Sequence, residues 1–153
     1  MESNLHWYEN IKIDIRDING NLLDTTQFRN QVTNSALNFI ANSLRTSTQD
    51  NEIKYMAWGS SSSTAEAADT LLSTEYGRKQ ITSQTSSNTG FCESVCYISP
   101  TEGVGTIAEI GWFAGSSATA TADSGCMISR VLYARVKTAL ESITVTRTDT
   151  FST

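Results

Sequence analysis

Residues 11–18 read Ile-Lys-Ile-Asp-Ile-Arg-Asp-Ile, a strict alternation of apolar and charged side chains. Successive side chains of a β-strand point to opposite faces, so this alternation predicts a strand with one buried face. Asn19-Gly20 follows, and this pair is a strong hairpin signal because both central turn positions need positive φ. Leu22 and Leu23 then start a return strand. The stretch therefore predicts an antiparallel hairpin, and with it a fold built on antiparallel sheet.

Further segments have the composition or the alternation of strands. They are residues 53–58, 79–84, 91–99, 106–114, 126–136 and 142–152. In the last of them apolar residues share one face, and Thr144, Thr146, Thr148 and Thr150 share the other. We expect these threonines to form a polar sheet face. The small-residue stretch between Gly115 and Gly125 is predicted to be a mobile loop.

A helix is predicted from Thr25 or Thr26, either of which can serve as N-cap, to about Arg45. Its apolar residues fall on one broad stripe: Phe28, Val32, Ala36, Leu37, Phe39, Ile40, Ala41 and Leu44. Asparagines recur on the opposite side, which we interpret as a solvated face, with a partner-docking face as the alternative. The expected fold class is α+β, mainly antiparallel β (sandwich- or barrel-like), with one long N-terminal amphipathic helix.

Size and charge narrow the function classes. Residues 1–153 show no repeat or linker and suit a single domain, with residues 1–10 as a candidate N-terminal contact arm. A net charge of −5, from 11 basic and 16 acidic residues, does not favour nucleic-acid binding. No apolar run approaches a membrane span, and the N-terminal residues do not resemble a signal peptide. We expect a protein made in the cytoplasm, without nucleic-acid or membrane partners.

Residues for nucleophilic or metal chemistry are sparse. His6 is the only histidine, and a terminal position suits a Ser-His-Asp arrangement poorly. Cys92 and Cys96 are too far apart on one strand for a disulfide, and Cys126 stands alone. None of the three has a zinc-binding spacing. We expect no catalytic residues, no metal, no cofactor and no enzymatic activity.

Charged residues interrupt apolar surroundings at Glu75, Glu109 and Arg130. Buried charges need partners, so we interpret these residues as structural ion pairs, with Arg78 as a further member. The alternative, an acid/base pair, is disfavoured because arginine does not titrate. A second group of residues is aromatic and lies in the predicted strands, where it can form core, as we favour, or line a sugar-binding face. This group is Tyr55, Trp58, Tyr97, Trp112, Phe113 and Tyr133.

The order of several segments resembles a family of small structural proteins of tailed phages, described as decoration-like or tail-fibre-like. The matching segments are 30–44 (NQVTNSALNFIANSL), 53–59 (IKYMAWG), 69–83 (DTLLSTEYGRKQITS), 107–114 (IAEIGWFA), 127–133 (MISRVLY) and 137–150 (KTALESITVTRTDT). The resemblance implies a virion component and not an enzyme. The chain has no long shaft and no coiled-coil stem, which favours a decoration (cement) protein over a fibre.

The resemblance does not fix the place on the particle, and each place implies different partners. A decoration protein is expected to be a homotrimer bound to the major capsid protein, and the alternative is a tail fibre, adaptor or baseplate component bound to tail proteins. Under the first hypothesis Leu5, Trp7 and Tyr8 are candidate interface residues, because exposed aromatic and apolar side chains usually bury at a contact. A third hypothesis is a cellular carbohydrate-binding or hydrolytic module.

Overall fold

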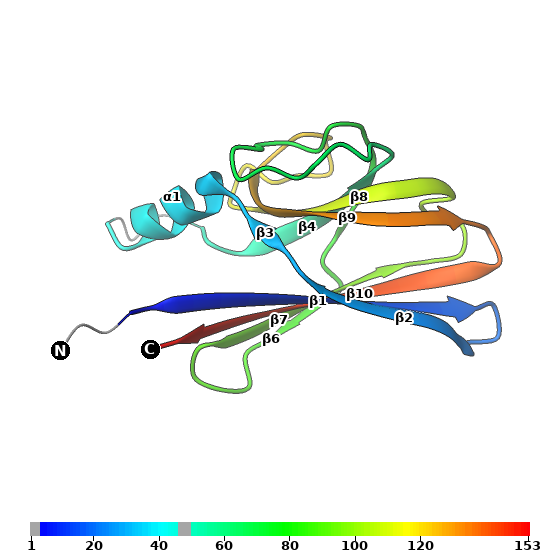
Figure 1. Cartoon of the computed structure of the whole chain (residues 1–153), viewed down its shortest axis with the longest axis horizontal. Helices are drawn as coiled ribbons and strands as arrows, with labels where there is room; N and C mark the ends of the chain where they lie inside the picture. The colour runs from blue at the N-terminus through cyan, green and yellow to red at the C-terminus, as the bar shows by residue number, and fades with distance from the viewer. Residues whose placement is uncertain (1–3, 46–49) are drawn as a thin grey trace.

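The chain folds into two antiparallel sheets that pack face to face (Figure 1). The computed structural model describes residues 4–45 and 50–153. Sheet A has the order β2 (Leu22–Arg29), β1 (His6–Asp17), β10 (Glu141–Ser152), β7 (Phe91–Ile98) and β6 (Ser83–Thr85). Sheet B has the order β3 (Gln31–Val32), β9 (Cys126–Lys137), β8 (Gly105–Ala114), β4 (Ile53–Gly59) and β5 (Glu75–Gln80). The mainly antiparallel β character predicted from the sequence is confirmed.

The main core lies between the sheets. Ile11, Ile13 and Ile15 of β1 are fully buried, in the period of two that the sequence shows. From sheet B, Trp58 and Trp112 join the same cluster. Each large apolar side chain buried in this way stabilises the fold by roughly 1.5–3 kcal/mol. The alternation that opens the sequence therefore builds one wall of the core.

The long N-terminal helix is the main error of the sequence prediction. Residues 25–29 belong to β2, which pairs with residues 10–16 of β1. Helix α1 has 10 residues, Asn34–Ser43, and its N-cap is Thr33, whose hydroxyl accepts the Ala36 amide at 3.1 Å. The β-branched Thr25 and Thr26 favour a strand, and the hairpin provides partners for their backbone groups. The fold is a β-sandwich with one short helix.

The other predicted strands are present, with ends shifted by a few residues. One predicted strand, residues 79–84, contains a corner between the sheets. β5 ends in sheet B, and β6 begins in sheet A three residues later. At the corner the Ile81 amide bonds to the Lys54 carbonyl of β4, and the Thr82 amide bonds to Val95 of β7. The chain thus joins the two sheets without breaking the run of hydrogen bonds.

Two loops lie over the outer face of sheet B (Figure 1). We call residues 60–74 the serine loop and residues 115–125 the alanine loop. Leu72 of the serine loop and Ala118 of the alanine loop are buried in a cluster with Phe113 and Met127. The part of sheet B beneath these loops is therefore covered on both faces, whereas the outer face of sheet A carries the partly exposed threonines of β10.

Strand β10 joins the two halves of sheet A. It pairs with β1 along its whole length, from His6↔Ser152 to Asp17↔Glu141, and with β7 on its other side. The same register places Glu9 opposite Asp149. Charged residues therefore enter the row of inward-facing positions near one end of the sandwich.

Candidate functional site

Arg130 on β9 is the centre of a buried charge cluster that reaches into the serine loop. Its Nε donates to Glu109 Oε2 at 2.9 Å, and its Nη1 donates to Asp69 Oδ2 at 2.7 Å. Its other N–H groups bond to backbone and hydroxyl oxygens of the serine loop. Arg130 and Glu109, which the sequence marked as an ion pair, thus lie together and fix the loop to sheet B.

Glu109 is fully buried, yet both of its carboxylate oxygens have partners. The amide of Ser73 donates to Oε2 at 3.0 Å, and the amide of Thr74 donates to Oε1 at 2.7 Å. Gly59 on the neighbouring strand leaves the space for this carboxylate, because a Cβ at that position would lie 2.4 Å from Glu109 Oε1. The cluster therefore has no room for a side chain at position 59.

Arg78 on β5 fixes the alanine loop in a similar way. Its Nε and Nη2 donate to the two oxygens of Glu75 at 2.6 and 2.9 Å. Its Nη1 donates to the carbonyls of Thr119 and Ser124, both at 3.0 Å. The guanidinium lies 4.5 Å from the centroid of the Phe113 ring. The loop that composition predicts to be mobile therefore has an anchor that composition does not reveal.

A third charge cluster, which the sequence interpretation missed, lies between the two sheets. Arg147 on β10 is fully buried, and its Nε and Nη2 donate to Asp149 at 2.7 and 2.8 Å. Its Nη1 lies 3.1 Å from Glu9 Oε1 of β1 and also donates to the Ser129 hydroxyl of β9. One arginine thus faces two buried carboxylates and links sheet A to sheet B.

Glu9 is the least satisfied member of this cluster. Its Oε1 accepts hydrogen bonds from Asn30 and Ser129 at 2.8 and 2.9 Å, but its buried Oε2 has no partner among the described residues. Desolvation raises the pKa of Glu9; Arg147 opposes this rise and Asp149 adds to it. Glu9 therefore takes up a proton more readily than an ordinary glutamate.

The period of two could have revealed this cluster. Arg147 and Asp149 occupy the same face of β10 as Ile143 and Val145, and Glu9 occupies the inward face of β1. A charged residue in the core row of a predicted strand is the signal, since such a residue needs a buried partner.

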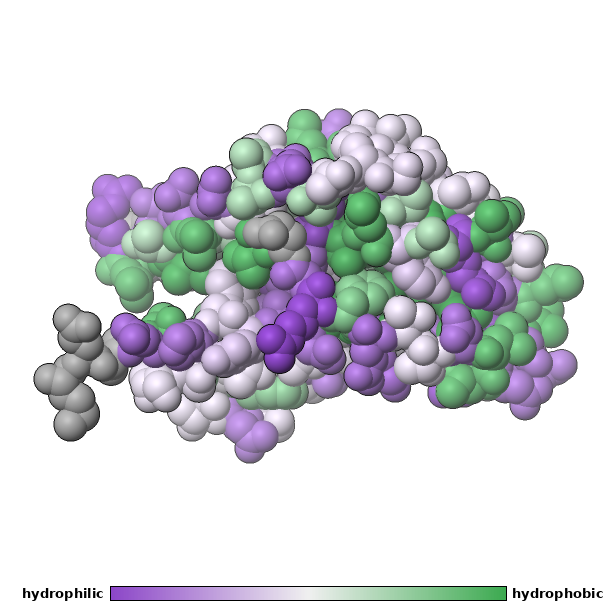
Figure 2. Space-filling model, viewed as in Figure 1, coloured by the Kyte–Doolittle hydropathy of each residue, from purple (hydrophilic) through white to green (hydrophobic). Residues whose placement is uncertain are grey.

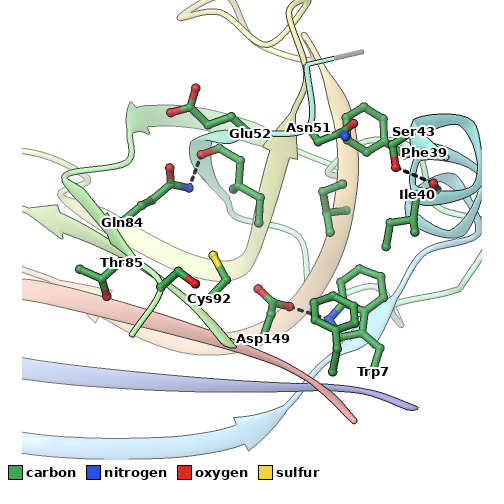
Figure 3. A pocket seen from close by; sticks show the side chains of 14 residues that line it. Trp7, Phe39, Ile40, Ser43, Asn51, Glu52, Gln84, Thr85, Cys92 and Asp149 are labelled. Carbon is green, nitrogen blue, oxygen red and sulfur yellow. Dashed lines mark hydrogen bonds between the residues drawn. The ribbon is translucent and has the colours of Figure 1, made fainter. Parts of the chain in front are cut away.

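A cavity of about 420 Å³ opens between the sheets beside the Arg147 cluster (Figure 3). Phe39 and Ile40 reach it from α1, and Trp7 borders it from β1 (Figure 3). Trp7 Nε1 donates to Asp149 Oδ1 at 2.8 Å. Further apolar side chains in its lining are Ile53, Ile128 and Phe151. Its volume lies in the range of roughly 300–1,000 Å³ that is usual for binding pockets.

Three free cysteines lie near or within the core. Cys92 lines the cavity, Cys96 is buried and Cys126 is half-buried. Burial raises the pKa of Cys96 to about 12, and it also raises the pKa of Cys92 and Cys126. The thiolate is the nucleophilic form, so these thiols are unreactive near neutral pH.

Leu5, Trp7 and Tyr8, the predicted interface residues, lie at the same end as the cavity. Residues 6–10 of the candidate contact arm belong to β1 and pair with β10, and residues 1–3 lie outside the described part. Trp7 faces inward to the cavity. Leu5 is 69% exposed and Tyr8 is 48% exposed. Leu5 and Tyr8 are therefore more accessible to a partner than Trp7.

Exposed apolar side chains gather at the opposite end of the sandwich. They lie in or directly beside the turns β1–β2 and β9–β10, which are neighbours because Asp17 pairs with Glu141. Figure 2 shows hydrophobic side chains over this end of the molecule. We call this set the apolar tip: Ile18, Leu22, Leu23, Val136 and Leu140, each more than 50% exposed.

The aromatic residues of the strands divide between core and surface. Trp58, Trp112, Phe113 and Tyr133 are buried, whereas Tyr97 is exposed on sheet A. The core interpretation therefore holds for four of the six aromatic positions considered, and these four cannot line a sugar-binding face.

Within residues 4–45 and 50–153, no three His, Cys, Asp or Glu side chains gather as a metal-binding group. The helix in this part of the chain is too short and polar to cross a membrane. No protein-family model matches the chain, and no curated protein or solved structure is significantly similar to it. The resemblance to phage structural proteins stays a prediction.

Proposed function

We propose that the chain is a non-enzymatic virion structural protein of a tailed bacteriophage, made in the host cytoplasm and carried on the particle. Its place in this proposal is the capsid surface, where it acts as a decoration protein that binds the major capsid protein. The proposal joins the resemblance of residues 30–150 to phage structural proteins with one feature of the geometry.

The apolar tip is the observation that carries the proposal. Large apolar side chains scattered singly on a surface are ordinary, but several together on adjacent turns mark a contact with another protein. Here five such side chains share one end of a sandwich whose sheet A face is polar. A subunit that attaches by this end would bury them and leave the threonine face in solvent.

The buried charge clusters support a structural role as well. The N–H groups of Arg130 and Arg78 donate hydrogen bonds to loop carbonyls, hydroxyls and carboxylates within the chain. Arginine is always protonated, so these groups can hold loops in place but cannot exchange protons with a substrate. These hydrogen bonds hold the serine loop and the alanine loop against sheet B, so the two loops form a rigid surface.

A tail fibre, adaptor or baseplate component is the alternative, and the alanine loop favours it. Its exposed residues sit on an anchored backbone, since Arg78 bonds to two of its carbonyls. A preorganised loop loses little entropy when it binds, which suits a receptor contact.

Electron microscopy of particles of the phage that encodes the chain tests the proposal. Density for the sandwich on the capsid surface, with the apolar tip toward the shell, is the expected result. Density confined to the tail would favour the alternative and reject a decoration role. Absence of the chain from purified particles, by mass spectrometry, would reject both.

A variant series tests the apolar tip. Leu22→Asp combined with Leu140→Asp should abolish attachment to particles that lack the native protein, because a charge would have to be desolvated at each position. Leu71→Asp is the matched control, since Leu71 is an exposed leucine on the serine loop. Equal attachment of the tip variant and the control would reject the tip as the contact.

A further inference from the structure

The charged side chains that border the cavity between the sheets all have one sign. Of the described residues that line it, only Glu52 and Asp149 are charged, and both are acidic. Asp149 reaches the cavity from β10 beside Trp7, whereas Glu52 is exposed (Figure 3). A hollow with apolar walls and charges of one sign concentrates ions of the opposite sign. The lining therefore favours a ligand with a positive charge.

The buried cluster that contains Asp149 has the same excess of negative groups. Arg147 pairs with both Glu9 and Asp149, so one cation faces two carboxylates. The Oε2 atom of Glu9 has no partner in the described part of the chain, and burial raises the pKa of this residue. Asp149 is the member of the cluster that borders the cavity. A cation in the cavity would therefore add positive charge where the cluster lacks it.

Aromatic rings form a second feature that suits a cation. Trp7 and Phe151 stack with their ring centroids 5.3 Å apart, and Phe39 reaches the cavity from α1. The hydrogen bond from Trp7 Nε1 to Asp149 Oδ1 holds the indole next to the carboxylate. The face of an aromatic ring is the negative part of its quadrupole, so it attracts a cation. Carboxylate and rings thus favour the same kind of group.

The remaining walls determine which kind of cation fits. Ile40, Ile53 and Ile128 give the cavity apolar surface that a bare ion would leave uncovered. A calcium or magnesium ion takes six or more oxygen ligands, which two carboxylates among rings and isoleucines do not supply. An ammonium group on a hydrocarbon or aryl body contacts both kinds of wall. The cavity volume of about 420 Å³ is also in the range of small-molecule sites.

We propose that the cavity binds a small organic ammonium ion, with its charged group beside Asp149 and Trp7 and its apolar body against Phe39 and Ile40. One copy of the chain supplies the whole site. The site lies at the end of the sandwich opposite the apolar tip. It therefore goes beyond the proposed function and does not depend on it.

Titration of the full chain with three probes of similar size is the test. They are phenethylammonium, the neutral phenethyl alcohol and the anionic phenylpropionate. We expect phenethylammonium to bind saturably with a dissociation constant of about 1 mM, since the probe is small. The alcohol should bind about tenfold more weakly, because it loses the attraction to the carboxylates and rings. Phenylpropionate should not bind.

NMR spectra of the backbone amides give both the affinity and the place of binding. On addition of phenethylammonium, the resonances that move should belong to cavity residues, among them Phe39, Gln84 and Cys92. Absence of saturable binding would overturn the proposal. So would equal affinity for the ammonium ion and the alcohol, or shifts that centre on any other part of the molecule.

A pair of variants tests the charge at the exposed side of the cavity. Glu52→Gln should lower the affinity for phenethylammonium by about threefold and leave the alcohol unaffected. Glu66→Gln is the matched control, since it changes the net charge equally at an exposed position on the serine loop that does not line the cavity. Equal effects of the two variants would show that the cavity does not recognise the charge and would overturn the proposal.

Another variant tests the rings. Phe39→Leu keeps an apolar side chain in the cavity but removes one ring, so the ratio of ammonium to alcohol affinity should fall by about threefold. A purely structural role of Phe39 would weaken both probes equally and leave this ratio unchanged, which would contradict the ring contact. Asp149→Asn is a poorer test, because it would also remove a partner of the buried Arg147.

The two proposals fail separately. Ligand binding is measured on the isolated chain, so its absence leaves the virion role standing. Absence of the chain from purified particles would reject the virion role, while selective binding of phenethylammonium in the cavity would still establish the site.

Discussion

Two buried arginines, Arg130 and Arg147, each face two carboxylates, but only the Arg130 cluster includes a carboxylate that is appreciably exposed. In the Arg130 cluster the side chain of Asp69 is 25% exposed, and Glu109 accepts two backbone amides in addition to the arginine. In the Arg147 cluster the two carboxylate side chains are 1% and 5% exposed. Each cluster therefore has one arginine and two carboxylates, but the carboxylates differ in solvent exposure and in the number of backbone amides that bond to them.

These surroundings shift the pKa of Asp69 in the Arg130 cluster and of Glu9 in the Arg147 cluster in opposite directions. Desolvation works to raise the pKa of Asp69, but hydrogen bonds from the Glu66 amide and from Arg130 outweigh it and lower this pKa overall. In the other cluster desolvation prevails and raises the pKa of Glu9. Exposure and backbone donors, rather than the count of charges, determine whether a buried carboxylate stays ionised.

The largest expected effect comes from removing the cation of the first cluster. Arg130→Ala should lower the free energy of unfolding by about 3–5 kcal/mol, because Glu109 would remain buried without its cation and the serine loop would lose its anchor. Urea unfolding at neutral pH measures the change. Arg29→Ala, at an exposed position on β2, should stay within about 0.5 kcal/mol. A loss no larger than that of the control would show that Arg130 is not needed to hold Glu109.

A smaller effect tests how tightly the same cluster is packed. Gly59→Ala would place a Cβ 2.4 Å from Glu109 Oε1 and 2.5 Å from the Thr74 carbonyl oxygen, so the carboxylate or the serine loop must move. We expect a loss of about 1–3 kcal/mol in the free energy of unfolding. Ser60→Ala, at the adjacent exposed position, is the control, and equal stability of the two variants would show that the cluster adapts.

In the Arg147 cluster, the raised pKa of Glu9 should make the free energy of unfolding depend on pH. Since the folded pKa of Glu9 lies above 4.5, its contribution to stability is complete below about pH 4.5 and is lost as pH rises through the folded pKa. Glu9→Gln removes this loss, so the stability of the variant relative to the native chain should increase as pH rises above about 4.5. Urea unfolding across that range gives the difference, and a difference independent of pH would contradict the assignment.

The smallest effect has the opposite sign. Because the folded pKa of Asp69 lies below 3.8, its contribution to stability is present above about pH 3.8 and is lost as pH falls through the folded pKa. Asp69→Asn should therefore cost about 0.5–1 kcal/mol at neutral pH, a small amount because the side chain is partly exposed. The cost should vanish in acid. A cost that persists in acid would assign the effect to packing instead.

Period-two patterns predicted the strands that bury one face, and apolar composition predicted strands such as β8, which is buried on both faces. The alternation at residues 11–18 became β1, and the segments ending in Gly59 and starting at Phe91 became β4 and β7. The helix was overestimated because the stripe from Phe28 to Leu44 satisfies a helical period, yet its first part pairs with β1. A local sequence pattern does not reveal that a distant strand, here β1, is available to pair with the segment.

The candidate site was predictable only in part. Glu109 and Arg130 stood out because apolar neighbours surround them in sequence. Their other partners could not be inferred, since Asp69 and the serine loop meet Arg130 only through the fold. The cavity depends on α1 closing over the end of the sandwich, and no short motif encodes that arrangement. The apolar tip likewise forms only because two turns far apart in sequence become neighbours.

The central place of β10 has a consequence for the order of folding. Sheet A consists of one hairpin, β1–β2, and one pair, β6–β7, and β10 lies between them. Until β10 is synthesised and inserted, each half exposes a strand edge and its row of core isoleucines or cysteines to other chains. Contacts between residues as distant in sequence as His6 and Ser152 slow folding, typically to milliseconds or seconds for sandwich folds. The nascent chain should therefore be most prone to aggregate before its last strand is made, and coexpressed chaperones should raise its soluble yield.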